Sequence, residues 1–143
     1  MSRKATAVIL LVATLALLLS ACAAAEKLTE YEFGTDKVPS VNAVIGESRK
    51  VTSVNVGTSN GVPYREYTYT TNTMVDDLGQ YTTFLRSRGW LATIDFNFYD
   101  GRGDAQLAIN SADAGKILVM FIAFEPNRYT IRVEKLVGEL TAY

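Results

Sequence analysis

The polar side chains best suited to bind a ligand lie around one predicted turn. Asp95 and Asn97 fall on the polar side of an alternating segment, and Asp100 and Asp104 belong to the turn that follows. Such oxygens suit Ca²⁺, which takes about 6–8 oxygen ligands. However, their spacing fits no EF-hand loop, and Arg102 places a cation inside the group. We predict turn-forming and solvated side chains here and no metal site, and we keep the four polar residues as candidate binding residues.

Two tyrosines are the other candidates for a binding surface. Tyr64 and Tyr99 fall on the polar sides of their predicted strands, among eight tyrosines in the chain. An exposed tyrosine can stack on a sugar or anchor a protein interface. Single exposed aromatic side chains are also ordinary on protein surfaces. We therefore treat Tyr64 and Tyr99 as candidate binding residues, together with Asp95 and its three polar neighbours.

The composition leaves few routes to catalysis. Histidine is absent, which removes His-based triads and imidazole metal ligands, and the single cysteine excludes an intramolecular disulfide. Asp76 and Asp77 are adjacent on a predicted helix and point in different directions, unlike the paired carboxylates of a glycosidase. A Ser–Lys dyad needs a buried lysine, whereas Ser48-Arg49-Lys50 has the composition of a solvated turn. We predict a non-enzymatic protein with no cofactor.

The N-terminal residues have the pattern of an export signal. Two basic residues precede an uncharged apolar run from Ala5 to Leu19, and small residues follow it. The sequence Leu19-Ser20-Ala21-Cys22 resembles the lipobox of bacterial lipoproteins. The resemblance implies that residues 1–21 are cleaved and that Cys22 carries a diacylglyceryl thioether.

A lipid on Cys22 would hold the protein at a membrane, because two acyl chains anchor stably without a spanning helix. The alternative is an uncleaved anchor at residues 5–25, but its strongly apolar part ends at Leu19, which is short for a span of about 30 Å. Ala23 follows the cysteine, and by resemblance to enterobacterial sorting signals this favours the outer membrane if the host has one. We predict a lipid-anchored protein on the extracytoplasmic side of the cell membrane.

The net charge of the mature chain does not favour nucleic acid as a class of partner. Cleavage of residues 1–21 removes two basic residues, so 12 remain against 15 acidic ones and the net charge becomes −3. No basic block alternates with aromatic residues. The expected partners are the membrane, through Cys22, and another protein or a second copy of the chain.

The segment 73–88 has the apolar spacing of an amphipathic helix. Its apolar face consists of Met74, Leu78, Tyr81 and Leu85. Asn72 or Thr73 can cap its start, and Asp76 and Asp77 suit the positive end of its dipole. Gly89 suits the left-handed position after the helix, and Trp90 can close a contact back onto Leu85.

Alternation with period two predicts seven strands. We expect them at residues 38–45, 49–56, 62–71, 90–99, 105–111, 116–124 and 129–136. The segment 116–124 is apolar on both faces, which is typical of a central strand covered on both sides. Because one helix covers only one side, the second face needs curvature, loops or another molecule.

Short turns between successive strands force antiparallel neighbours. The sequence therefore predicts an α+β fold: an antiparallel sheet of about six or seven strands, with one amphipathic helix at about residues 73–88 packed on one face. The expected element order is β-β-β-α-β-β-β-β. The expected organisation is a signal peptide at 1–21, a lipidated cysteine and tether at 22–33, and a single domain at 34–143.

The mature part resembles small uncharacterised α+β lipoproteins of gut Gram-positive bacteria. The shared features are a Tyr-Thr-rich strand, an acidic helix start, and the helix exit formed by Tyr81, Leu85, Gly89 and Trp90. This resemblance implies no activity and no catalytic residues. We expect a non-enzymatic, lipid-anchored envelope protein that binds a protein or associates with itself. The alternatives are a small-ligand or glycan-binding lipoprotein that uses Tyr64 and Tyr99, and a divergent hydrolase.

Overall fold

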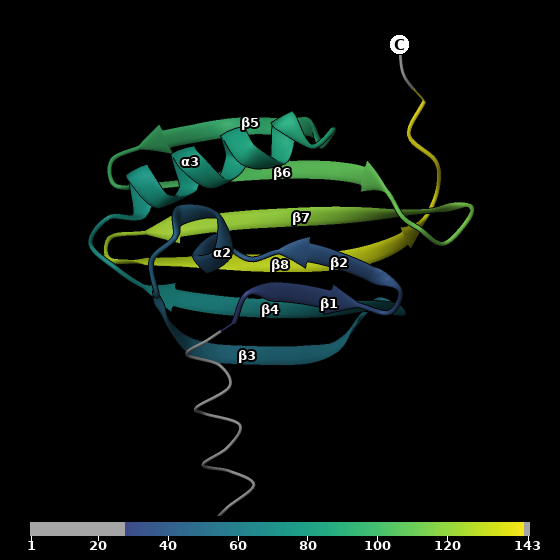
Figure 1. The fold of residues 1–143 in the computed structure, drawn as a ribbon, viewed down its shortest axis with the longest axis horizontal. Helices are drawn as coiled ribbons and strands as arrows, with labels where there is room; N and C mark the ends of the chain where they lie inside the picture. Colours follow the sequence, from purple (N-terminus) through teal and green to yellow (C-terminus); the bar gives the residue numbers. More distant parts are fainter. Residues whose placement is uncertain (1–27, 142–143) are drawn as a thin grey trace, which may run out of the picture.

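The computed structural model describes residues 28–141, so the predicted signal peptide and Cys22 lie outside the described residues. A six-stranded antiparallel sheet has the order β3-β4-β8-β7-β6-β5, and a two-stranded sheet and two helices lie on one side of it (Figure 1). In chain order the elements are β1 (Glu30–Phe33), β2 (Asp36–Pro39), α2 (Val41–Ile45), β3 (Lys50–Ser59), β4 (Val62–Thr70), α3 (Met74–Ser87), β5 (Leu91–Tyr99), β6 (Arg102–Asn110), β7 (Lys116–Glu125) and β8 (Arg128–Val137). The predicted class, α+β with an antiparallel sheet, is confirmed.

Helix α3 matches its prediction to within one residue at each end. Gly89 has a φ of +89°, and the backbone N–H of Trp90 donates to the carbonyl of Leu85 at 3.1 Å. This is the helix exit that the sequence predicts, and Trp90 is buried behind it. Thr73 is the N-cap, but its hydroxyl donates to Asp77 Oδ1 at 3.1 Å instead of capping a backbone N–H.

The N-terminal part differs from the prediction. Residues 30–33, expected in a tether, form β1, where Tyr31 and Phe33 are buried. The expected strand at 38–45 is wrong beyond Pro39: the Ser40 hydroxyl accepts from the N–H of Ala43 at 3.4 Å and begins helix α2. Pro39 has no N–H to donate to a sheet, and serine is a preferred N-cap residue, so the strand ends at Pro39 and a helix begins after Ser40. The element order is therefore β-β-α-β-β-α-β-β-β-β.

The helix side of the sheet, here called the inner face, forms the core. Strands β7 and β8 are the two central strands, which confirms the predicted place of β7. Four successive apolar side chains of β7 on the inner face are buried: Leu118, Met120, Ile122 and Phe124. The cover is shared, because α3 lies over β5 and β6 while the β1–β2 hairpin lies over β8 and β4 (Figure 1). One predicted helix alone would have left half of this face open.

The opposite side, the outer face, has little cover from the described residues. Val119 is buried there by its neighbours, whereas Phe121 is half-buried and Ala123 is exposed. At one end, Asn110 exchanges hydrogen bonds with Leu140, so the C-terminal residues 138–140 reach this side. The second apolar face of β7 is thus shielded only in part.

Candidate interaction surface

The structure does not bring the two candidate tyrosines together. Tyr64 lies on β4 and Tyr99 at the end of β5, with three strands between them. The Arg132 guanidinium stacks 3.9 Å from the centre of the Tyr64 ring. On the neighbouring strand, a Cβ on Gly57 would lie 2.9 Å from the Tyr64 hydroxyl oxygen, so this glycine leaves room for the ring. Tyr64 is packed against its own sheet, while Tyr99 is 81% exposed.

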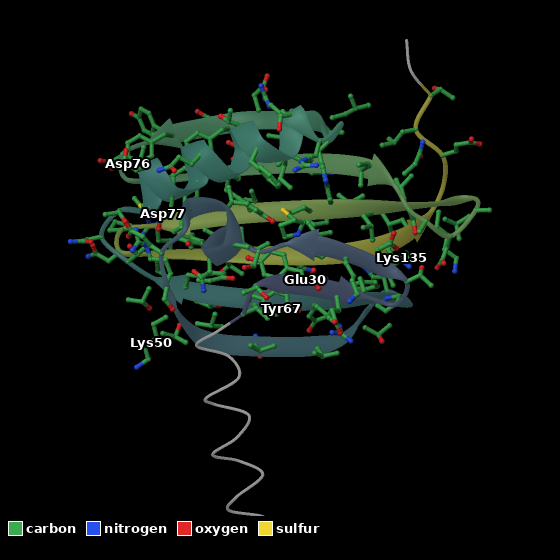
Figure 2. The ribbon with its side chains drawn as sticks, in the orientation of Figure 1. Glu30, Lys50, Tyr67, Asp76, Asp77 and Lys135 are labelled. Atoms are coloured by element: carbon green, nitrogen blue, oxygen red, sulfur yellow. The ribbon has the colours of Figure 1, made fainter. Side chains whose placement is uncertain are left out.

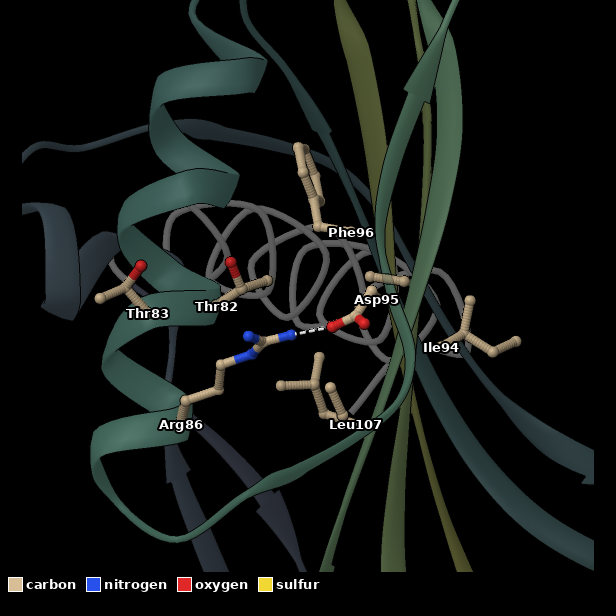
Figure 3. A pocket seen from close by; sticks show the side chains of 9 residues that line it. Thr82, Thr83, Arg86, Ile94, Asp95, Phe96 and Leu107 are labelled. Carbon is tan, nitrogen blue, oxygen red and sulfur yellow. Dashed lines mark hydrogen bonds and ion pairs between the residues drawn. The ribbon is translucent and has the colours of Figure 1, made fainter.

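The four polar candidates also separate onto different sides. Asn97 and Asp104 are cross-strand partners on the outer face. Asp95 turns the other way and pairs with Arg86 of α3 (Figure 3). Asp100 lies in the β5–β6 turn with a φ of +51°. Among residues 28–141, no group of three or more acidic, cysteine or histidine side chains could hold a metal ion.

Two register shifts in β5 explain this separation. The pairing with β6 slips between Ala92 and Ile94 and again between Ile94 and Asn97. Each β-bulge adds a residue and reverses which side the following residues face. The first shift therefore turns Ile94 to the outer face. The second shift reverses the orientation again, so Phe96 lies on the inner face, where its ring stacks on Phe124 at 5.0 Å. The prediction that residues 90–98 alternate without interruption is wrong at these two bulges.

A cavity of about 320 Å³ lies between α3 and β5 (Figure 3). Arg86 and Asp95 form an ion pair across it, and the Thr82 hydroxyl donates to the carbonyl of Leu78 at 2.8 Å. Its charged groups therefore neutralise each other within the chain. Its size lies near the lower limit for small-molecule sites. Neither Tyr64 nor Tyr99 lines it.

A buried ion pair fixes the start of β3 to α3. Arg49 donates to both carboxylate oxygens of Asp77, at 2.7 Å and 2.9 Å, and the Asp77 side chain is only 3% exposed. The Asn42 side chain holds the backbone of Arg49 through two further hydrogen bonds. Burial, and then the Asp77 carboxylate, raise the pKa of Tyr129 beside this pair. The expectation of a solvated turn at residues 48–50 holds for Ser48 and Lys50, which are exposed, but is wrong for Arg49.

A second charged cluster, at the other end of the sheet, contains a buried lysine (Figure 2). Lys135 of β8 lies 2.6 Å from Asp36 and 2.9 Å from Asp113. The Ser111 hydroxyl donates to Asp36 at 2.7 Å. Burial alone would lower the pKa of Lys135, but the hydrogen bonds to Asp36 and Asp113 outweigh burial and raise it. Ser111 and Lys135 thus meet at one carboxylate, but the lysine is held protonated, opposite to what a catalytic base requires.

The outer face carries an apolar patch over β5, β6 and β7. The cross-strand rows run Leu91–Ala108–Val119 and Ile94–Gln106–Phe121. We define the outer patch by its apolar members: Leu91, Ile94, Ala108, Val119 and Phe121. Leu91 and Ile94 are exposed, and the same rows continue onto β8 at Glu134 and Arg132, which form an ion pair at 2.6 Å. The patch is therefore bordered by charge on one side.

The β3 edge of the sheet is a second exposed apolar feature. A register shift between Val51 and Ser53 turns Val54 and Val56 to the inner face, contrary to uninterrupted alternation. There they lie beyond the cover of the β1–β2 hairpin, with exposed fractions of 46% and 70%. The sequence did not predict this, because the pattern shows the valines but not the bulge that reorients them.

Comparisons with protein-family models, with curated proteins and with solved structures give no match for this chain. Within residues 28–141, neither helix combines the length and the apolar character needed to cross a membrane.

Proposed function

We propose that this chain is a non-enzymatic, lipid-anchored protein of the bacterial envelope, which binds another protein through the outer patch of its sheet. The observation that carries the proposal is the exposure of Leu91 and Ile94 next to half-buried Phe121, on a face that neither helix covers. Adjacent apolar side chains with a charged border are typical of protein interfaces.

The charged groups support a role without catalysis. Asp77 and Arg49 are engaged in a buried pair, and Lys135 is held between Asp36 and Asp113. These ion pairs hold the start of β3 against α3, and β8 against Asp36 of β2 and Asp113. This pairing leaves neither cluster with the unpaired base that acid–base catalysis needs.

The anchor is tested by Cys22→Ser in the full chain. We expect the variant to lose lipid labelling and to leave the membrane fraction, because a single lipid site supports the attachment. If the variant stays in the membrane with residues 3–25 intact, the segment is a spanning anchor and the lipid mechanism is wrong.

The binding surface is tested by photo-crosslinking in the native membrane. A photoreactive residue at Ile94 should capture a partner protein, identified by mass spectrometry. The matched control is Gln80, an exposed residue of α3 on the opposite side of the sheet. A partner captured from position 94 but not from position 80 supports the proposal, whereas equal capture from both positions contradicts it.

A small-ligand role is the second candidate, favoured by one further cavity. This cavity, of about 330 Å³, is lined by Trp90, Phe84 and Arg88 between the end of α3 and the sheet. Lys37 and Asp36 line it as well, so the aromatic wall carries two cations and one carboxylate, a combination that could accept a small acidic or aromatic molecule. Binding of such a ligand would be lost in Trp90→Ala and kept in Ile94→Lys, whereas binding of a protein by the outer patch would respond in the opposite way.

A further inference from the structure

We propose that β3 pairs edge to edge with β3 of a second copy, forming a two-fold dimer with one continuous sheet. This interface is separate from the outer patch and goes beyond the proposed function. From Ser53 to Ser59 the strand pairs regularly with β4 on one side, and no described strand pairs with its other side. Its backbone groups on that side are free to form a further antiparallel ladder.

The sequence of the edge suits pairing with itself. Residues 51–64 contain no charged side chain, so no like charges would meet when the strand faces its own copy. Val54 and Val56 are placed symmetrically about Asn55. A two-fold axis at Asn55 therefore sets each Val54 opposite the partner's Val56 on the inner face. These two valines are among the exposed large apolar residues of the described chain, and this pairing buries them.

The other edge explains why pairing would stop at two copies. Strand β5 carries two register shifts, and Arg86 of α3 holds Asp95 beside it. Bulges and charges at an edge hinder further strand pairing. Since β3 is the open edge of the six-stranded sheet and its pairing with a second copy uses the same strand of both chains, the assembly closes as a dimer instead of growing into a filament.

The symmetry also agrees with attachment to one membrane, a point that rests on the proposed lipid anchor. A two-fold axis through an antiparallel pair runs perpendicular to the sheet, so both inner faces lie on the same side. Strand β1 lies on the inner face (Figure 1), so both chains enter their domains from that side. Residues 22–28 span at most about 25 Å when extended. Two anchors could therefore enter the same membrane.

The first experiment introduces one cysteine into the full chain in the bacterial membrane. Asn55→Cys places two thiols opposite each other, where Cα atoms of an antiparallel pair lie about 4.5–5.5 Å apart, within disulfide range. We expect a disulfide-linked dimer on a non-reducing gel. Tyr99→Cys is the control: Tyr99 is more exposed, so random collision would favour it. If Asn55→Cys gives no more dimer than Tyr99→Cys, the proposal is overturned.

The second experiment uses charge to test the register. Asn55 is exposed, and its side-chain amide donates a hydrogen bond to Glu66 at 3.2 Å, so Asn55→Lys and Asn55→Asp should fold, as their melting temperatures would verify. Each variant should reduce co-purification of two tagged copies about fivefold, and mixing the Lys and Asp variants should restore it. No restoration overturns the two-fold at Asn55.

The outcomes separate this inference from the proposed function. A disulfide between position 55 and another protein would mean that β3 pairs with a different partner, and it overturns the dimer alone. A β3 dimer without any partner captured at position 94 supports the dimer and counts against the role of the outer patch.

Discussion

The two edge strands of the six-stranded sheet, β3 and β5, differ in the features that hinder pairing with a further strand. Strand β5 has two register shifts, a helix beside it and a charged pair, whereas β3 is regular and uncharged from Ser53 to Ser59. Natural proteins protect edge strands against unwanted pairing with bulges, charges and cover. All three devices occur at β5. The contrast indicates that this protein blocks pairing at one edge and leaves it open at the other.

Both edges are nevertheless tied to α3 by an Arg–Asp pair. At the β3 side the pair is Arg49–Asp77, with a carboxylate that is almost fully buried. At the β5 side it is Arg86–Asp95, with an aspartate side chain that is 85% exposed. The same two residue types should therefore differ in their contribution to stability, because water screens the exposed pair and not the buried one.

The largest effect is expected at the buried pair. Asp77→Asn removes the buried carboxylate from Arg49 and leaves it only the exposed Glu47, at 2.5 Å, so the free energy of unfolding should fall by about 3 kcal/mol. A thermal melt should show a fall of about 10 °C. The control is Asp76→Asn, an exposed neighbour in the same helical turn, which should cost no more than about 0.5 kcal/mol. Equal losses for the two variants would mean that the pair does not hold β3 to α3.

The Lys135 cluster should make stability depend on pH in the acid range. Hydrogen bonds from Lys135 and Thr35 lower the pKa of Asp113 to about 2. Burial would raise the pKa of Asp36, but its hydrogen bonds, first from the N–H of Ala112 and then from Lys135, lower it. A carboxylate with a depressed folded pKa stabilises the protein above its unfolded pKa of about 3.9 and loses this effect as the pH falls through the folded value.

Lys135→Gln tests this dependence. We expect the difference in melting temperature between wild type and variant to be greatest above pH 4 or so and to shrink toward about pH 2, since the aspartates then become protonated in both proteins. Melts at several pH values measure it. A constant difference over this range would show that the lysine acts through packing alone.

The exit of α3 into β5 gives a smaller effect. Gly89→Val places a β-branched residue at a φ of +89° and should cost about 1–2 kcal/mol. No atom lies within 4 Å of a Cβ at Gly89, so the cost comes from the backbone alone. Gly79→Ala is the matched control, in the interior of α3 with the same free space, and should instead stabilise by about 0.5–1 kcal/mol. An unchanged melting temperature in Gly89→Val would contradict the left-handed exit.

These elements show which parts of the fold the sequence predicts. The ends of α3, the exit at Gly89 and the central place of β7 follow from local patterns, and all three are confirmed. Strand β1 and helix α2 were missed, because four or five residues carry too little periodicity. Their structure depends on packing, as with Tyr31, whose hydroxyl lies 2.7 Å from that of Tyr69 across the core.

The candidate site was harder to predict, for a physical reason. One added residue in a strand reverses the faces of all that follow, and a sequence does not mark where a bulge occurs. Asp95 therefore lies on the inner side, away from the expected polar side, and Val54 shares the inner face with Val51, where uninterrupted alternation would not place it. The burial of Lys135 does have a signal in the sequence, because Lys135 falls at the next inward position after Tyr129, Ile131 and Val133. A charged residue in an inward position predicts a buried partner, and the partners are Asp36 and Asp113.

The smallest effect is expected at the exposed pair of the β5 edge. Arg86→Ala removes the partner of Asp95, but both groups stay hydrated, so the free energy of unfolding should change by less than about 0.5 kcal/mol. A loss as large as that of Asp77→Asn would show that burial does not distinguish the two pairs.

The two register shifts of β5 remain in this variant, so we expect the edge to stay unable to pair. Tyr99→Cys in the Arg86→Ala background should then give no more disulfide dimer than Tyr99→Cys alone, and an increase would mean that the charge, and not the bulges, protects this edge.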